Sequence, residues 1–68
     1  MDTKLLGKIL KARREKLGMN QHEVARALWV SQPVLSRWEN GKREIGLSNF
    51  VALCRLYGIQ PGKVLRRF

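Results

Sequence analysis

Hydrophobic residues recur every three or four positions along most of the chain, which is the spacing of one face of a helix. Leu6, Leu10 and Leu17 form such a stripe near the start. A second stripe lies between two glycines later in the chain and consists of Leu47, Phe50, Leu53, Cys54 and Tyr57. No stretch alternates with a period of two, so the pattern predicts helices and no strands.

Capping residues divide the first half of the chain into two helices. Asp2, or the threonine after it, can cap a first helix that runs through Leu17, with Gly18 as its left-handed terminator. Asn20 can cap a second helix, because Glu23 three residues later completes a pair that resembles a capping box. Only two residues then separate the second helix from the next cap.

The second half of the chain predicts three further helices. Ser31 can cap a third helix, which ends at Asn40–Gly41. A fourth helix carries the second stripe, begins within residues 46–48 and stops at the glycine that follows the stripe. Pro61 suits the first position of a short fifth helix that ends near Phe68.

The length of 68 residues indicates one small domain, near the lower limit of what a single hydrophobic core can stabilise. The chain has one cysteine, Cys54, and one histidine, His22, so a single chain cannot form a disulfide or a tetrahedral zinc site. We expect Cys54 to pack as a small hydrophobe and assign His22 no role. The sequence predicts no metal, no cofactor and no small-molecule ligand.

The formal net charge of +9 indicates a polyanionic partner such as nucleic acid. An anionic membrane surface is the alternative, because the segment KLLGKILKARREK is basic and partly amphipathic. The apolar runs are too short to cross a bilayer, and no signal-peptide pattern is visible. We expect a cytoplasmic protein of prokaryotic or phage origin, associated with the nucleoid when bound.

The third predicted helix has two chemically different faces. Val34, Leu35 and Trp38 gather on one side of a helical wheel. The other side consists of Gln32, Pro33, Ser36, Arg37 and Asn40. This second face has no carboxylate, and glutamine and arginine can form paired hydrogen bonds with the edges of adenine and guanine. We interpret it as a base-reading face, with an ordinary solvated face as the alternative.

Residues 21–40, QHEVARALWVSQPVLSRWEN, resemble the helix-turn-helix of the phage repressor and Cro-like family, also called the Xre family. The similarity extends through LGKILKARREKLGMNQ before the motif and through ENGKR and LSNFVALCRLYGI after it. It implies an all-α, compact five-helix fold of the lambda-repressor type over residues 1–68. In that fold the second and third helices form the helix-turn-helix.

Candidate DNA contacts follow from these positions. Gln32 and Arg37 are expected to contact bases, with Ser36 and Pro33 as secondary contacts. The resemblance implies that Gln21, at the start of the second helix, binds a phosphate. The other expected phosphate contacts are Ser31, Asn40, Lys42 and Arg43. General electrostatic attraction is expected from Arg13, Lys16, Arg26 and Arg55.

Arg14 lies at the edge of the first hydrophobic stripe, where a charge is costly unless it is paired. The resemblance implies that Glu39, at the end of the third helix, is its partner in a structural salt bridge. The alternative is that Arg14 extends to solvent.

Two residues of the motif are unusual. Pro33 would be the second residue of the third helix, where its missing N–H is not needed, so it can contact a thymine methyl group or simply stiffen the helix. Trp29 occupies a turn position that commonly has a positive φ, which strains a bulky residue. We expect its indole to cover an apolar edge of the domain against the fourth helix, with an exposed surface for a partner as the alternative.

The predicted function is a sequence-specific double-stranded DNA-binding transcriptional regulator, by default a repressor, that binds a palindromic operator as a homodimer. Residues expected to form the dimer interface are Ile45, Val51, Leu56 and Phe68. An antitoxin of the same fold, with a toxin protein as its main partner, is the alternative. Ser31, Ser36 and His22 are not arranged as a catalytic set, so we expect no enzyme.

Overall fold

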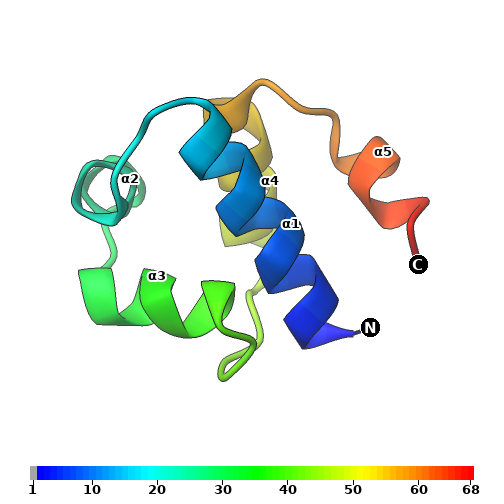
Figure 1. Ribbon diagram of the computed structural model, residues 1–68, viewed down its shortest axis with the longest axis horizontal. Coiled ribbons are helices and arrows are strands. Elements are labelled where there is room, and N and C mark those ends of the chain that lie inside the picture. Colours follow the sequence, from blue (N-terminus) through cyan, green and yellow to red (C-terminus); the bar gives the residue numbers. More distant parts are fainter. Residues whose placement is uncertain (1) are drawn as a thin grey trace.

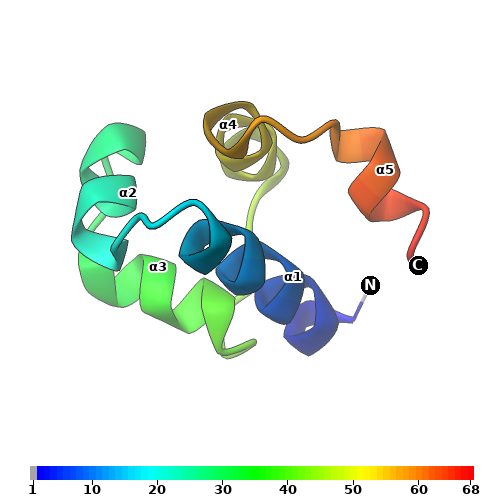
Figure 2. The ribbon, with the colours of Figure 1, turned by 45° about the horizontal axis from the view of Figure 1, so that its top comes forward.

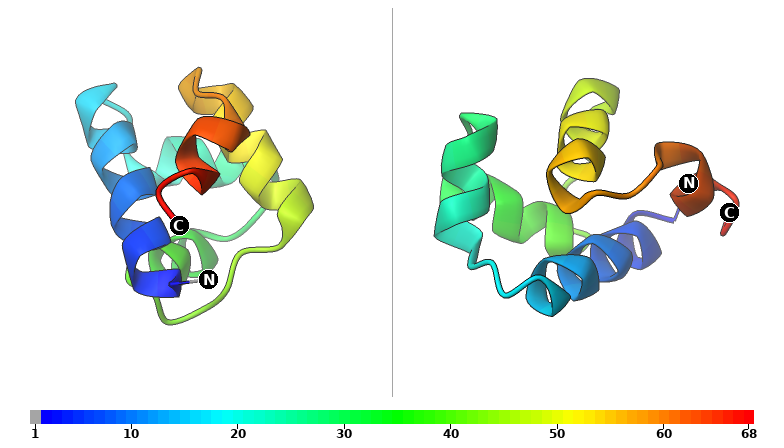
Figure 3. Two further views of the ribbon diagram at one scale, coloured as in Figure 1. Left: turned by 90° about the vertical axis from the view of Figure 1, so that its right-hand side faces the viewer. Right: turned by 90° about the horizontal axis from the view of Figure 1, so that it is seen from above.

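Five helices and no strand make up residues 2–68, the part of the chain that the computed structural model describes (Figure 1). The helices are α1 (Thr3–Lys16), α2 (Gln21–Leu28), α3 (Gln32–Glu39), α4 (Leu47–Tyr57) and α5 (Pro61–Leu65). The predicted all-helical fold with five helices is therefore confirmed. α2 and α5 lie on opposite sides of the α1 and α4 pair (Figures 1 and 3).

The first three helices begin at the capping residues that the sequence predicts. The Asp2 side chain accepts a hydrogen bond from the Leu5 N–H at 3.0 Å. Asn20 and Glu23 form a complete capping box, with bonds of 2.8 and 3.0 Å. Ser31 Oγ accepts from the Val34 N–H at 3.4 Å, beside Pro33 in the first turn of α3. The proline is thus accommodated where a helix needs no internal N–H donor.

The fifth helix is shorter than predicted. α5 ends at Leu65, and the residues up to Phe68 continue in a turn instead. Phe68 N–H bonds to the Leu65 carbonyl and Arg67 N–H to the Val64 carbonyl, each three residues back. These bonds are those of a tightened final turn, not of an α-helix.

The four longer helices end in the same pair of backbone hydrogen bonds, a Schellman motif around one left-handed residue. Three of the left-handed residues are Gly18, Gly41 and Gly58, with φ values of 72°, 69° and 68°. The fourth is Trp29 at the end of α2, with φ 60°, and among residues 2–68 it is the one non-glycine residue with a positive φ. The predicted backbone strain at Trp29 is therefore present.

The Trp29 indole does not cover an edge of the domain, so that expectation is wrong. Its exposed fraction is 95%. Trp29 is the left-handed residue that ends α2, and no helix of the described residues packs over its side chain. The neighbouring packing positions are filled by Leu28 and Val30, which are partly buried against the core.

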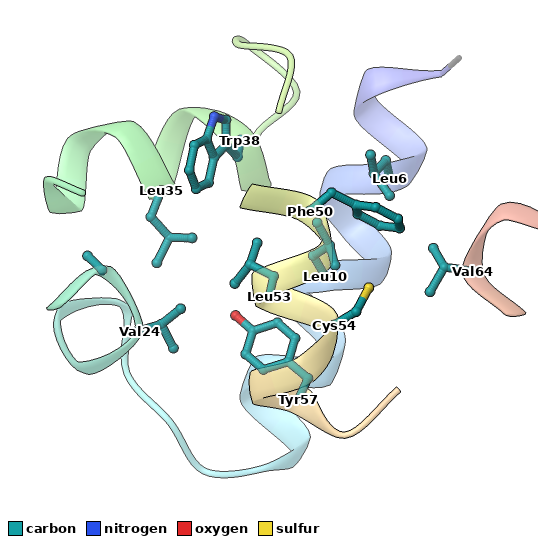
Figure 4. Close-up of a cluster of buried hydrophobic side chains, with 11 residues drawn as sticks. Leu6, Leu10, Val24, Leu35, Trp38, Phe50, Leu53, Cys54, Tyr57 and Val64 are labelled. Atoms are coloured by element: carbon teal, nitrogen blue, oxygen red, sulfur yellow. The ribbon is translucent and has the colours of Figure 1, made fainter. Parts of the chain in front are cut away.

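One core fills the space between the helices (Figure 4). Val24, Leu35 and Leu53 come from three different helices and point toward one another, and Leu53 and Val24 are fully buried. The remaining buried members are Leu6, Leu10, Ala25, Trp38, Phe50, Cys54, Tyr57 and Val64.

Leu47 does not belong to this core, although its spacing predicts it. As the first residue of α4 it lies at the margin, with 75% of its surface exposed.

Gly7 allows α1 to approach the end of α3 closely. A Cβ atom at this position would lie 2.5 Å from the Glu39 carbonyl oxygen and closer still to that of Trp38. Real Cβ atoms do not come this near to backbone oxygens, so only glycine fits. The contact sets the distance between α1 and α3.

We expect Trp29→Gly to increase the free energy of unfolding by about 1 kcal/mol. Glycine removes a left-handed strain of roughly 1–2 kcal/mol, offset in part by its greater freedom in the unfolded chain. Urea unfolding followed by circular dichroism measures the change. Trp29→Ala is the matched control, since alanine keeps the strain; an equal gain in both variants would contradict the prediction.

Candidate nucleic-acid interface

α2 and α3 form a two-helix unit joined by a short turn. In Figure 1 α2 is seen end-on while α3 lies across the view, so their axes cross steeply, and Figure 2 shows the same arrangement from a second direction. Ala25 of α2 is 3% exposed, and its small side chain allows this crossing. The unit leaves one face of α3 uncovered.

That face of α3 has the composition that the sequence predicts. Gln32, Pro33, Arg37 and Asn40 are exposed, while Leu35, Trp38 and Glu39 on the other side are buried. Ser36 is half-buried, and its Oγ accepts a hydrogen bond from Asn40 Nδ2 at 3.3 Å. Of the expected base contacts, Ser36 is therefore the least accessible.

The expected phosphate contacts flank this face. Ser31 is exposed at the start of α3, although its hydroxyl already caps the helix. Lys42 and Arg43 are exposed just after α3. Gln21, at the first position of α2, is half-buried, because its side chain turns inward.

The salt bridge between Arg14 and Glu39 is present in the structure. Arg14 Nε lies 2.7 Å from Glu39 Oε2, and a second guanidinium N–H donates to Glu39 Oε1 at 3.0 Å. A third donates to the Met19 carbonyl at 2.9 Å. The side chains are 9% and 1% exposed. The hydrogen bonds to Glu39 raise the pKa of Arg14, so the guanidinium keeps its charge despite burial.

A chain of hydrogen bonds leads from this ion pair to the exposed face of α3. Gln21 Nε2 donates to Glu39 Oε1 at 2.8 Å, and Gln21 Oε1 accepts from Gln32 Nε2 at 3.3 Å. Gln32 Oε1 in turn lies 3.3 Å from His22 Nδ1. The Gln32 side chain, expected to contact bases, is thus held at both ends of its amide group.

The sequence does not reveal this chain of hydrogen bonds. Gln32 and Glu39 lie two turns apart on α3, but Gln21 belongs to α2, so no helical spacing connects Gln21 to either of them. His22, to which the sequence assigns no role, also contacts Gln32 of the other helix, and this contact is equally hidden in the sequence. These contacts depend on the steep crossing of α2 and α3, which brings the first residues of the two helices together.

Two buried titratable groups, Cys54 and Tyr57, lie outside this network. Burial raises the pKa of the Cys54 thiol and also that of the Tyr57 hydroxyl, so both stay protonated near neutral pH. Within residues 2–68, no three His, Cys, Asp or Glu side chains come close enough to hold a metal ion. Nor does any helix of these residues have the length and hydrophobicity needed to cross a membrane.

Comparisons with known proteins agree with this geometry. A helix-turn-helix family model matches residues 10–64. Repressor protein C2 of Salmonella phage P22 is 32% identical over 66 residues, which cover 97% of this chain and 31% of the repressor. The chain therefore spans about a third of the length of this curated relative.

Two solved structures resemble the fold. The clp gene regulator ClgR from Corynebacterium glutamicum has a TM-score of 0.90 and 29% identity, covering 96% of this chain and 69% of that chain. The restriction-modification controller protein C.AhdI from Aeromonas hydrophila has a TM-score of 0.85 and 24% identity, over 93% of this chain and 91% of that chain.

Five helices, a steeply crossed α2 and α3 and a polar outer face on α3 define a helix-turn-helix domain. The chain belongs to the helix-turn-helix family, as the resemblance in its sequence indicates.

We expect Arg14→Met and Glu39→Gln each to lower the free energy of unfolding by about 3 kcal/mol, because each leaves the other buried charge unpaired. The loss in the double variant should be smaller than the sum of the two single losses by about 1 kcal/mol or more. This difference is the coupling typical of groups in direct contact. Urea unfolding of the four proteins measures this coupling.

Arg13→Met combined with Glu39→Gln is the control cycle. Arg13 neighbours Arg14, but its Nε donates to the Tyr57 carbonyl at 3.4 Å and not to Glu39. Its coupling to Glu39 should be close to zero. Equal coupling in the two cycles would contradict a specific ion pair.

Proposed function

We propose that the protein is a sequence-specific double-stranded DNA-binding transcriptional regulator that places α3 in the major groove. The observation that carries this proposal is the exposed face of α3, which has amide and guanidinium groups and no accessible carboxylate. The net charge of +9 supports a polyanionic partner.

In the proposed complex, Gln32 and Arg37 read bases. Gln32 can donate to adenine N7 and accept from N6, and Arg37 can donate to guanine O6 and N7. Because the Gln32 amide is bonded to Gln21 and His22, it meets the base in a fixed orientation. Pro33 offers its ring to a thymine methyl group. Ser36 has a lesser part, since its hydroxyl already bonds Asn40.

Phosphate contacts on both sides of α3 would orient it in the groove. Gln21 uses one amide N–H for Glu39, which leaves the second N–H for a phosphate at the start of α2. Ser31 lies at the start of α3, and Asn40, Lys42 and Arg43 lie at its end. The two groups flank the proposed base contacts.

Repression through a palindromic operator is the proposed mode of action. One recognition helix reads only a few base pairs, so two-fold pairing of two chains doubles the site and places half-sites about one helical turn apart. The phage relative is named a repressor and the two structural relatives a gene regulator and a controller protein.

The dimer interface is proposed at an apolar pocket of about 230 Å³ near the start of α4. Ile45, Leu47 and Leu65 line it, and Leu47 and Leu65 are exposed. Of the residues expected from the sequence, Ile45, Val51 and Leu56 are partly buried against their own core, which limits what they can offer a partner. Phe68 remains available, with 46% of its surface exposed.

Selection of bound sequences from a random pool of DNA duplexes tests the proposal. Enrichment of a palindrome with two half-sites would support both specific binding and pairing. If no sequence is enriched at moderate salt, the proposal is wrong and a protein partner, such as a toxin, becomes the better hypothesis.

Arg37→Ala should relax the preference at one base pair of each half-site by about 1–3 kcal/mol and leave the other positions unchanged. Lys42→Ala, the matched control, should weaken all sequences alike and reduce the slope of log K against log salt by about 0.9. Binding isotherms on the selected operator and on single-base variants measure both effects. An equal loss on all sequences in the Arg37 variant would contradict its role as a base reader.

Leu47→Glu should shift the chain from dimer to monomer, because it places a charge at the centre of the proposed apolar interface. Sedimentation equilibrium measures the change in association. Leu17→Glu is the control, since Leu17 is also exposed, at 44%, but lies at the other end of α1. Association that survives Leu47→Glu would locate the interface elsewhere.

A further inference from the structure

Three lysines of α1 lie beside the end of α3. Lys4, Lys8 and Lys11 line one shallow groove of about 210 Å³ together with Glu39 and Asn40. All three lysines are exposed. The close approach of α1 at Gly7 fixes this arrangement, and Figure 2 shows the start of α1 next to the end of α3.

No ion pair of the described residues neutralises the positive charge of this lysine groove. Its one carboxylate, Glu39, is 3% exposed and bonds Arg14 through both oxygens and Gln21 through one. Within residues 2–68, no lysine lies within 4.0 Å of a carboxylate oxygen. The groove therefore presents three uncompensated charges to its surroundings.

This arrangement opposes the stability of α1. Lysines four and three residues apart on one helix face repel each other. Lys4 also lies in the first turn of α1, where a positive charge opposes the helix dipole. The charges of the three lysines therefore do not stabilise α1, and an anionic partner beside them would relieve their mutual repulsion.

We propose that Lys4, Lys8 and Lys11 bind the phosphate backbone of the DNA duplex, as an extension of the interface formed by α3. Asn40 connects the two surfaces, because it lines the lysine groove and also donates to Ser36 on the exposed face of α3. The inference rests on the proposed DNA binding and adds a second helix, α1, to the contact with the backbone.

A bilayer is the less suitable anionic partner. Membrane binding by α1 would require its hydrophobic stripe to enter the lipid, but Leu6 and Leu10 are 5% and 1% exposed because they form the core. The lining of the lysine groove contains no apolar residue. A duplex backbone needs only the charge.

The test is a variant that combines Lys4→Gln, Lys8→Gln and Lys11→Gln. Glutamine retains the helix propensity of lysine and removes the charge. A matched variant combines Lys16→Gln, Lys63→Gln and Arg67→Gln, which remove the same charge from a different groove between α1 and α5. Binding to the selected operator and to a mixed-sequence duplex is measured over a range of salt concentrations, together with the melting temperature.

We expect the lysine-groove variant to bind both duplexes at least tenfold more weakly at roughly 0.1 M salt. The salt slope should fall by about 0.9 for each lysine that contacts a phosphate. Its base preferences should not change, since the lysines touch no base. Its melting temperature should not fall, since the charges of the lysines do not stabilise α1. The matched variant should lose clearly less affinity and slope.

Three results would overturn the inference. The lysine-groove variant could bind as the wild type does, or both variants could lose the same slope, which would indicate only a general field. The variant could also keep DNA binding and lose binding to phosphatidylglycerol vesicles, which would assign the groove to a membrane. Failure of the proposed regulator function would give a different result. The wild type would then enrich no operator, while binding to the mixed-sequence duplex would still measure the contribution of the three lysines.

Discussion

The ion pair between Arg14 and Glu39 connects the folding of this domain to the position of its recognition helix. Arg14 belongs to α1 and Glu39 to the last turn of α3, and both side chains are buried. The same carboxylate holds Gln21, which in turn holds Gln32 on the exposed face of α3. The orientation of a proposed base-reading side chain therefore depends on a charge pair inside the protein. A change that breaks the contact between α1 and α3 would therefore also change the proposed specificity of α3.

Local rules predicted the helices of this chain because they act over three or four residues. Asp2, the pair Asn20 and Glu23, and Ser31 cap the helices as their spacing indicates. The glycine terminators are equally local. The failures occurred where a residue's surroundings come from another helix. Leu47 has the spacing of a core residue, but no helix covers the start of α4, and nothing packs over Trp29.

The same distinction applies to the candidate site. The composition of the exposed face of α3 follows from a helical wheel, and the family resemblance supplied Glu39 as the partner of Arg14. The contacts of Gln21 with Glu39 and Gln32, and the contact of His22 with Gln32, could not be predicted, because they depend on the angle at which α2 crosses α3. Gly7, which lets α1 approach the carbonyl groups at the end of α3, gives no sign of its importance in a helical wheel.

The contrast between the two tryptophans has a practical consequence for studies in solution. The Trp29 indole is surrounded by solvent, at 95% exposure, on the turn that leads into α3, whereas Trp38 is 5% exposed in the core. Their fluorescence reports on different parts of the molecule, since a solvated indole emits at longer wavelength and is quenched readily by iodide, and a buried one is protected. A single unlabelled chain thus contains one optical reporter for events at the turn and another for the packing of its interior.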